Sequence, residues 1–246
     1  MQEDELVGDG WDQSAEAWVR RVDSGDPSRV LLLDEAMLRA LGDVGGKRVC
    51  DIGCGEGRFC RKLRGLGAET LGLDPTDALI RLAKGRDDAG SYLRARAEAV
   101  PVQAESFDVA VSYVALVDVP DLTGAVKEMA RILRPGGRIV ASILSPMVTA
   151  NDSGWIKDEA GKPLHRLLSH YMEERADVVA WAGIRVVNYH RPLSMFLNAF
   201  LSLGLVLEAF EEPLLSEEAL HARPDLAPHN DVPLFQVWTW LKGPVC

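Results

Sequence analysis

Short apolar runs alternate with helical patterns between residues 46 and 144. Apolar runs predict strands at residues 47–52, 69–73, 92–95, 107–113 and 138–144. The run at 107–113 is almost continuously apolar, as expected for a strand that is buried on both faces. Helical patterns fill the intervals at 56–66, after Thr76, and from a capping Asp121 to Leu133. Strands that alternate with helices in this way predict βα units around a parallel sheet.

The pattern changes on both sides of this region. Before it, residues 11–22 and 27–41 predict two helices, with Pro27 at a first helical position after Asp26. After it, residues 146–191 lose the βα alternation and predict an inserted cap. The alternation resumes with a helix at 192–203 and a strand at 205–210. A loop at 213–233 and a last strand at 234–241 complete the chain.

Composition and charge narrow the class of protein. The 246 residues are 47% hydrophobic, which suits one large domain or one domain with an inserted cap. The net charge of −10 argues against a nucleic-acid partner, because an acidic surface repels phosphates. The acidic N-terminus and the lack of a long apolar run argue against a secretion signal and a membrane span.

The four cysteines do not form the pattern of a disulfide framework. Three of them, Cys50, Cys54 and Cys60, fall in one predicted strand-turn-helix segment, where small buried thiols are the expected role. The fourth is Cys246. We therefore expect a soluble protein of a reducing compartment, the cytoplasm.

A glycine-rich turn follows the first predicted strand. Residues 49–59 read Val-Cys-Asp-Ile-Gly-Cys-Gly-Glu-Gly-Arg-Phe, with glycines at 53, 55 and 57. Glycine permits a sharp turn with positive φ and lets a ligand approach the backbone. A dinucleotide-binding turn of the form G-x-G-x-x-G requires its last glycine at position 58, which is Arg58 here. The pattern therefore predicts a nucleotide-like ligand without a pyrophosphate.

Two acids accompany this turn. Asp74 ends the second predicted strand about 20 residues later, the spacing at which a carboxylate accepts the hydroxyls of a ribose. Asp51 precedes the first glycine and would repel a pyrophosphate, but it suits a ligand that carries an ammonium and a sulfonium. The alternative is a simple glycine-rich turn with two incidental acids.

These residues resemble the S-adenosylmethionine (SAM) binding motif of class I methyltransferases. The resemblance continues at residues 97–101 and 106–109, which are similar to the family's adenine-contacting loop and fourth strand, and at 133–137, a turn after a helix. The details are most similar to the small-molecule branch that includes the ubiquinone and menaquinone biosynthesis enzymes. Arg96 stands where the family often has an aspartate that binds adenine, so backbone groups around Ala97 and Glu98 must take that role.

The resemblance implies a fold and a division of the chain. The fold is α/β and Rossmann-like, a seven-stranded, mostly parallel sheet with the last strand antiparallel, helices on both faces and a cap after the fifth strand. Residues 1–45 would close over the donor, 46–145 would form the SAM-binding core, 146–191 the cap for the substrate, and 192–246 the rest of the sheet. The expected donor-site residues are Asp51, Gly53, Cys54, Gly55, Asp74, Pro75, Ala97, Glu98, Ser112, Tyr113, Trp11 and Arg29.

Several of these roles have alternatives. Trp11 and Trp18 are seven apart and share a helix face, so they are either a packing pair or, for Trp11, a SAM contact. Arg29 is expected either to pair with the methionine carboxylate of SAM or to be an exposed structural arginine.

The acceptor is predicted less directly. Residues 112–115 read Ser-Tyr-Val-Ala, which disfavours methylation of nucleic-acid bases and protein amides and also the metal-dependent catechol branch. We expect a small-molecule acceptor, an oxygen nucleophile, and no metal. The expected acceptor-site residues are Tyr189, His190, Arg191, Trp155 and Met147. His190 is a candidate general base, or alternatively a histidine at a helix entry that binds a backbone carbonyl. The alternatives for the whole chain are a SAM-binding regulatory protein without turnover and a tRNA-modifying methyltransferase. The oligomeric state is not predicted.

Overall fold

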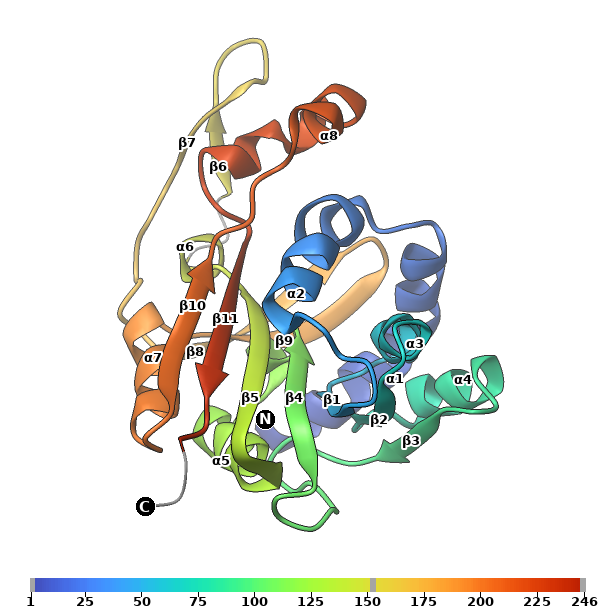
Figure 1. The fold of residues 1–246 in the computed structure, drawn as a ribbon. Coiled ribbons are helices and arrows are strands. Elements are labelled where there is room, and N and C mark those ends of the chain that lie inside the picture. The colour runs from blue at the N-terminus through green and yellow to red at the C-terminus, as the bar shows by residue number, and fades with distance from the viewer. Residues whose placement is uncertain (1–2, 151–153, 244–246) are drawn as a thin grey trace.

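A seven-stranded sheet forms the centre of the molecule, in the order β10-β11-β5-β4-β1-β2-β3 (Figure 1). The computed structural model describes residues 3–150 and 154–243, and side chains of the first helix from Gly10 onward. The strands are β1 Arg48–Ile52, β2 Glu69–Asp74, β3 Ser91–Arg94, β4 Phe107–Tyr113, β5 Leu133–Leu144, β10 Val206–Glu211 and β11 Phe235–Leu241. All pairs from β3 to β5 are parallel, and β11 is antiparallel to both β5 and β10. The predicted mostly parallel sheet with an antiparallel last strand is confirmed.

Helices cover both faces of this sheet. They are α1 Glu3–Asp23, α2 Asp34–Leu41, α3 Arg58–Gly65, α4 Asp77–Arg86, α5 Leu122–Ile132 and α7 Leu193–Leu201. In Figure 1, α2 lies in front of the sheet against β5 and β11, while α5 and α7 pack together behind it. Asp121 begins α5 as predicted, because its side chain accepts a hydrogen bond from the Gly124 N–H at 2.8 Å. Thr76 precedes α4, but its side chain makes no capping bond.

The segment before α2 differs from the single helix predicted at 27–41. A π-helical stretch, η1 Arg29–Leu33, comes directly before α2. A π-helical turn is wider than an α-helical one and is frequent at functional sites. Here it begins with Arg29, which faces the pocket described below.

Residues 146–191 form a short helix and two antiparallel hairpins outside the main sheet. The helix is α6 Pro146–Thr149, and the strands are β6 Trp155–Lys157, β7 Pro163–Arg166, β8 Arg175–Trp181 and β9 Ile184–His190. The β8–β9 hairpin packs on α1, whereas β6 and β7 pair with each other at the top of Figure 1.

The prediction of a loop at 213–233 is wrong. It contains α8 Glu217–Ala222 and a 3-10 helix, η3 Pro224–Asn230. The Ser216 hydroxyl accepts a hydrogen bond from the Ala219 N–H at 3.1 Å and begins α8. This cap was visible in the sequence.

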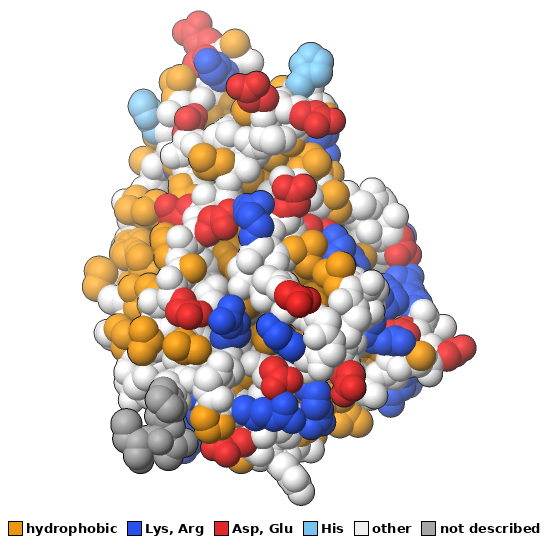
Figure 2. Space-filling view, in the orientation of Figure 1, with side chains coloured by type: hydrophobic (Ala, Val, Ile, Leu, Met, Phe, Trp, Pro, Cys, Tyr) orange, Lys and Arg blue, Asp and Glu red, His pale blue; other side chains and the backbone are white. Residues whose placement is uncertain are grey.

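The surface mixes charges and has one apolar edge. On the face in Figure 2, basic and acidic side chains are interspersed, and hydrophobic side chains gather over β10 and α7. Exposed residues there include Leu201, Val206, Leu207 and Phe210. Among the described helices, none is long and apolar enough to cross a membrane. Cys50, Cys54 and Cys60 are buried free thiols, and Cys246 lies outside the described residues.

The turn between β1 and α3 requires its glycines. Gly53, Gly55 and Gly57 have φ values of 80°, 56° and 80°, in the left-handed region that L-residues disfavour. A Cβ atom on Gly53 would also lie only 2.1 Å from the Cβ of Ala115 in the loop after β4. The two loops at this edge of the sheet therefore touch without space for a methyl group.

We expect Gly53→Ala to lower the free energy of unfolding by about 2 to 4 kcal/mol, from the positive φ and the overpacking together. The matched control is Gly46→Ala, since Gly46 has φ 69° and nothing within 4 Å of the added Cβ. That change should cost only about 1 kcal/mol. Urea denaturation of both variants measures the difference, and equal losses would contradict the close contact at Ala115.

Candidate functional site

A pocket opens at the carboxyl edge of the parallel strands, between the loops that follow β1, β2 and β4. The chain proceeds from β1 outward to β2 and β3 and then returns to β4 on the other side of β1. Ligands of open α/β sheets bind at such a reversal of strand order. The pocket encloses about 1180 Å³, its open mouth included, and α1 and η1 contribute to its wall.

All the donor-site residues named from the sequence line this one pocket. They are Trp11, Arg29, Asp51, Gly53, Cys54, Gly55, Asp74, Pro75, Ala97, Glu98, Ser112 and Tyr113. They come from six separate segments of the chain, so the fold brings together what the sequence analysis grouped by motif. Their individual contacts with a donor stay a prediction.

Asp74 ends β2 and supports the glycine turn. Its Oδ2 accepts a hydrogen bond from the Gly55 N–H at 2.9 Å, and its Oδ1 accepts one from the Thr76 N–H at 2.9 Å. Burial raises the pKa of Asp74, while these backbone bonds oppose the rise. Each carboxylate oxygen has a second lone pair. The side chain therefore retains the capacity to accept a hydrogen bond from a ligand hydroxyl.

Asp51 and Ser112 lie at the bottom of the pocket with unused polar atoms. Asp51 is 1% exposed, and its Oδ2 contacts the Cys60 thiol at 3.3 Å. Within the described residues its Oδ1 has no hydrogen-bond partner, and neither has the buried hydroxyl of Ser112. Burial raises the pKa of Asp51 to about 7. Buried polar atoms without partners are uncommon, so these two atoms favour a polar, cationic ligand at this point.

Helix α1 covers the pocket and is attached at several points. The rings of Trp11 and Trp18 pack edge to face with centroids 5.7 Å apart, and both line the pocket. The Ala78 N–H donates to Asp12 at 3.2 Å, which joins α1 to the start of α4. At the other end of α1, Asp23 accepts two hydrogen bonds from Arg86 at 2.9 and 2.8 Å. The tryptophan pair is thus both a packing pair and part of the wall.

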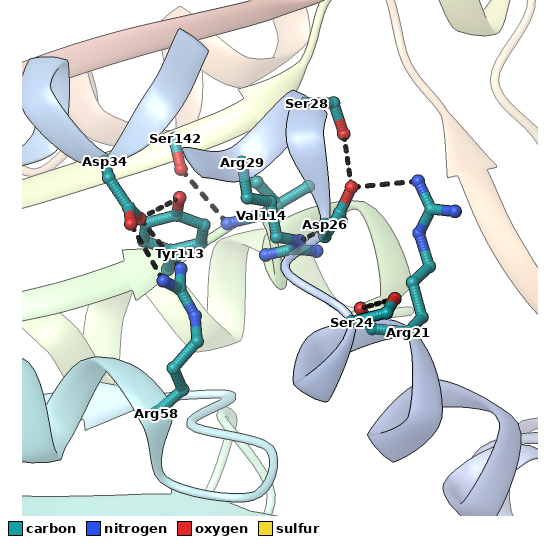
Figure 3. Close-up of polar contacts among 10 residues, drawn as sticks. All are labelled: Arg21, Ser24, Asp26, Ser28, Arg29, Asp34, Arg58, Tyr113, Val114 and Ser142. Atoms are coloured by element: carbon teal, nitrogen blue, oxygen red, sulfur yellow. Dashed lines mark hydrogen bonds and ion pairs between the residues drawn. The ribbon is translucent and has the colours of Figure 1, made fainter. Parts of the chain in front are cut away.

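Arg29 lies beside Asp26 and the ring of Tyr113 (Figure 3). Its guanidinium is over the ring of Trp18 at 4.6 Å and the ring of Tyr113 at 5.2 Å, and its Nε is 3.3 Å from Asp26. Only 17% of its side chain is exposed, which argues against the alternative of an exposed structural arginine. Burial lowers the pKa of Arg29. A cation held in this way can bind a carboxylate in the pocket.

Asp34, the first residue of α2, binds three partners from two other elements, and Figure 3 shows two of them, Arg58 and Tyr113. Arg58 donates to both carboxylate oxygens at 2.8 Å, Lys62 donates at 2.7 Å, and the Tyr113 hydroxyl donates at 2.8 Å. Burial alone would raise the pKa of Asp34, but these partners outweigh it and hold the pKa at about 2. Arg58, which replaces the last glycine of a dinucleotide-binding turn, thus joins α3 to α2.

The acceptor-site residues named from the sequence do not line the pocket. Met147 is 42% exposed on α6, and Trp155 lies in β6 of the distant hairpin. Arg191 is buried and donates to Glu174 and to the carbonyls of Val119 and Pro120, with its guanidinium over the Tyr189 ring at 5.0 Å. Arg191 therefore supports the loop that carries the pocket wall.

His190 is engaged at both ring nitrogens. Its Nε2 is 2.9 Å from the Tyr171 carbonyl oxygen and its Nδ1 is 2.7 Å from the Thr149 hydroxyl. Because a carbonyl can only accept, Nε2 bears the proton. Burial lowers the pKa of His190, so Nδ1 of the neutral ring accepts from Thr149. This geometry matches the alternative of a helix-entry histidine that binds a backbone carbonyl.

Asp118 is an acidic pocket residue that the sequence analysis missed. It ends the short 3-10 helix η2, Leu116–Asp118, which follows β4, and it lines the pocket with Val119 and Pro120. The Asn188 amide of β9 donates a hydrogen bond to it. A signal was present, since an acid five residues after the end of a parallel strand falls at the edge where ligands bind. Among the described residues, no group of three or more His, Cys, Asp and Glu side chains is arranged to hold a metal.

We expect Asp34→Asn to lower the free energy of unfolding at pH 7 by about 2 kcal/mol, because Arg58 and Lys62 lose their shared anion and both are partly exposed to water. The folded-state pKa is depressed, so the wild-type advantage is present above about pH 4 and is lost as the pH falls toward 2. Urea denaturation at pH 7 and pH 3 should show the gap narrowing. Asp43→Asn is the control, because Asp43 is exposed and binds only the Gly45 N–H; a gap independent of pH would contradict the role of the Asp34 charge.

Comparisons with known proteins agree with this geometry. Residues 50–141 match the family model described as a methyltransferase domain. The chain is 41% identical over 96 residues to a malonyl-[acyl-carrier protein] O-methyltransferase of Salmonella typhimurium, covering 39% of this chain and 38% of the relative. It is 36% identical over 115 residues to a ubiquinone biosynthesis O-methyltransferase of Bradyrhizobium diazoefficiens, covering 45% of each. The matches thus span less than half the length of these two relatives.

A solved structure extends the similarity to nearly the whole fold. The SAM-dependent methyltransferase from Mesorhizobium loti superimposes with a TM-score of 0.77 and 32% identity, covering 84% of this chain and 96% of that one. A structure from Listeria monocytogenes, a protein described as a putative SAM-dependent methyltransferase, has a TM-score of 0.75 at 24% identity and covers 85% of this chain and 95% of that one; at this identity it supports the fold alone. The glycine turn, the acids at the strand ends and the match to the Mesorhizobium loti enzyme lead to one conclusion: the chain belongs to the class I SAM-dependent methyltransferases.

Proposed function

We propose that this protein transfers a methyl group from SAM to an oxygen of a small molecule and releases S-adenosylhomocysteine. The observation that carries the proposal is the pocket at the reversal of strand order, where residues suited to each part of SAM converge. The reaction is a direct in-line displacement and requires no metal. The protein aligns donor and acceptor and excludes water.

The residues present fit SAM from one end to the other. Asp74 has the capacity to accept a hydrogen bond from a ribose hydroxyl. The unpaired Oδ1 of Asp51 suits the methionine ammonium, and the buried cation of Arg29 suits the methionine carboxylate. The adenine would lie beside Ala97 and Glu98, and Arg96 pairs with Glu98 at 3.2 Å. The ammonium and the carboxylate of the donor thus each have an opposite charge in the wall.

The aromatic side chains of the pocket wall suit the positively charged sulfur of SAM. When bound, SAM provides an activated methyl on a positively charged sulfur. The rings of Trp11, Trp18 and Tyr113 line the pocket, and aromatic faces attract cations. Together with α1 they keep water away from the methyl carbon, which favours attack by the acceptor over hydrolysis.

An oxygen acceptor is supported by the names of the relatives. The malonyl-[acyl-carrier protein] and ubiquinone biosynthesis enzymes are both O-methyltransferases. The cap insertion of residues 146–191 contributes Asn188 next to the pocket residue Asp118. We therefore propose that the acceptor binds between the β8–β9 hairpin, which carries Asn188, and the donor.

Calorimetric titration should show that wild-type protein binds S-adenosylhomocysteine with a micromolar Kd. Asp74→Ala should weaken binding about 10- to 100-fold, because hydrogen bonds to a charged group contribute about 1.5–3 kcal/mol. Asp77→Ala is the matched control, since Asp77 pairs with Arg81 and does not line the pocket. Wild-type protein that fails to bind, or Asp74→Ala protein that folds and binds equally well, would overturn the proposal.

Two measurements distinguish the proposed function from its alternatives: incubation with labelled SAM and small-molecule acceptors, and titration with tRNA at several salt concentrations. A SAM-binding regulatory protein would bind the ligand without any turnover. A tRNA-modifying enzyme would bind tRNA with an affinity that falls steeply with salt.

A further inference from the structure

We propose that Asp118 accepts the proton of the acceptor during methyl transfer, and that the acceptor group is therefore a hydroxyl and not a free carboxylate. This inference rests on the proposed function and assigns the acceptor side of the same pocket. It depends on four observations: the position of Asp118 in the wall, the backbone that directs it there, its partners, and the charges around it.

The backbone before Asp118 is held in an unusual conformation. Val114, directly after β4, has a φ of 59°, which is rare for a β-branched residue. Its N–H donates to the Ser142 carbonyl at 3.0 Å and is 3.1 Å from the Ser142 hydroxyl (Figure 3). Such strain persists where the surrounding structure enforces it and is concentrated at functional sites. Here it turns the chain so that η2 carries Asp118 to the pocket wall.

Asp118 contacts groups from the elements around it. The amide of Asn188, from β9, donates to its Oδ1. The indole of Trp11, from α1, lines the same pocket and lowers the pKa of the Asp118 carboxyl group. The charges of Arg29 and Asp74 also act on its carboxyl group. These two residues line the same pocket as Asp118 and stand at the expected sites of the methionine carboxylate and the ribose, so we place the donor sulfur beside Asp118.

These surroundings place the proton affinity of Asp118 in a useful range. Burial raises the pKa of Asp118 to about 8; Asn188, Arg29 and Trp11 lower it, and Asp74 raises it. A general base works best when its pKa is near the working pH. A positive charge on the donor sulfur would favour the ionised form of Asp118, so binding of SAM prepares the base.

The step is then balanced. A lone pair of the acceptor oxygen forms the new bond to the methyl carbon, and the carbon–sulfur bonding pair stays on sulfur. The hydroxyl proton passes to Asp118, which later releases it to water. A free carboxylate has no proton to transfer, and its negative charge would be repelled by ionised Asp118.

The first test uses two donor analogues and needs no acceptor. Sinefungin carries an amine where SAM has its sulfonium methyl, whereas S-adenosylhomocysteine has nothing there. By calorimetry, Asp118→Asn should lose about tenfold in sinefungin affinity and change S-adenosylhomocysteine affinity less than about threefold. Asn keeps an oxygen for the Asn188 amide, so folding is preserved. The control Asp121→Asn, in which asparagine still caps α5, should change neither affinity.

The second test measures the protons that the protein releases when the donor binds. Titrations at pH 7.5 in buffers of different ionisation enthalpy count the protons released on binding. Wild-type protein should release more protons with SAM than with S-adenosylhomocysteine, because the sulfonium lowers the pKa of Asp118. This difference should vanish in Asp118→Asn and persist in Asp121→Asn. A purely structural role for Asp118 would not produce it.

The outcomes separate this inference from the proposed function. If wild-type protein binds none of the ligands, the proposed function fails and this inference fails with it. If the ligands bind but Asp118→Asn leaves the affinity ratio or the proton release unchanged, only this inference fails. Methylation of malonyl-[acyl-carrier protein] by wild-type protein would also overturn it, because that acceptor group is a carboxylate.

Discussion

A carboxylate inside a protein must find cations or donors, because leaving it unpaired costs several kcal/mol. Asp34 meets this requirement with Arg58, Lys62 and Tyr113, which come from α3 and β4. The N-terminal segment is therefore positioned by a charge that lies beneath the pocket. Tyr113 connects Asp34 to the pocket, because its hydroxyl binds Asp34 and the Arg29 guanidinium lies over its ring. One buried anion, Asp34, thus fixes η1 and α2 relative to α3 and β4.

The two sides of the pocket are built from different parts of the chain. The donor side uses loops that follow consecutive strands, so its residues lie close together in sequence and follow a recognisable spacing. The acceptor side that we propose uses the end of η2 and the β9 strand, which meet through Asp118 and Asn188, 70 positions apart. A family can therefore keep its donor chemistry while the inserted hairpin changes the acceptor.

This difference explains what the sequence could predict. Strands such as 107–113 are buried on both faces and alternate with helices, so their positions along the chain and the parallel core of the sheet follow from the pattern of apolar residues. The antiparallel last strand followed only from the resemblance to the methyltransferase family. Gly53 and Asp74 were identifiable because their chemistry depends on local backbone geometry. The approach of Asn188 to Asp118 depends on how a hairpin packs on α1, and no local pattern encodes that packing. His190 stood out as a titratable group near the cap, but the Tyr171 carbonyl that engages it is 19 residues away.

The attachment of α1 to the β8–β9 hairpin also affects how the chain folds during synthesis. The Ser14 hydroxyl binds the Arg185 carbonyl at 3.2 Å across 171 positions of sequence. At about 5–20 residues per second, a ribosome needs roughly 10 to 30 s to make that interval. For this time Trp11 and Trp18 lack their partners Ile184 and Val186. The helix that covers the finished site therefore exposes two tryptophans in the nascent protein until the hairpin has been made.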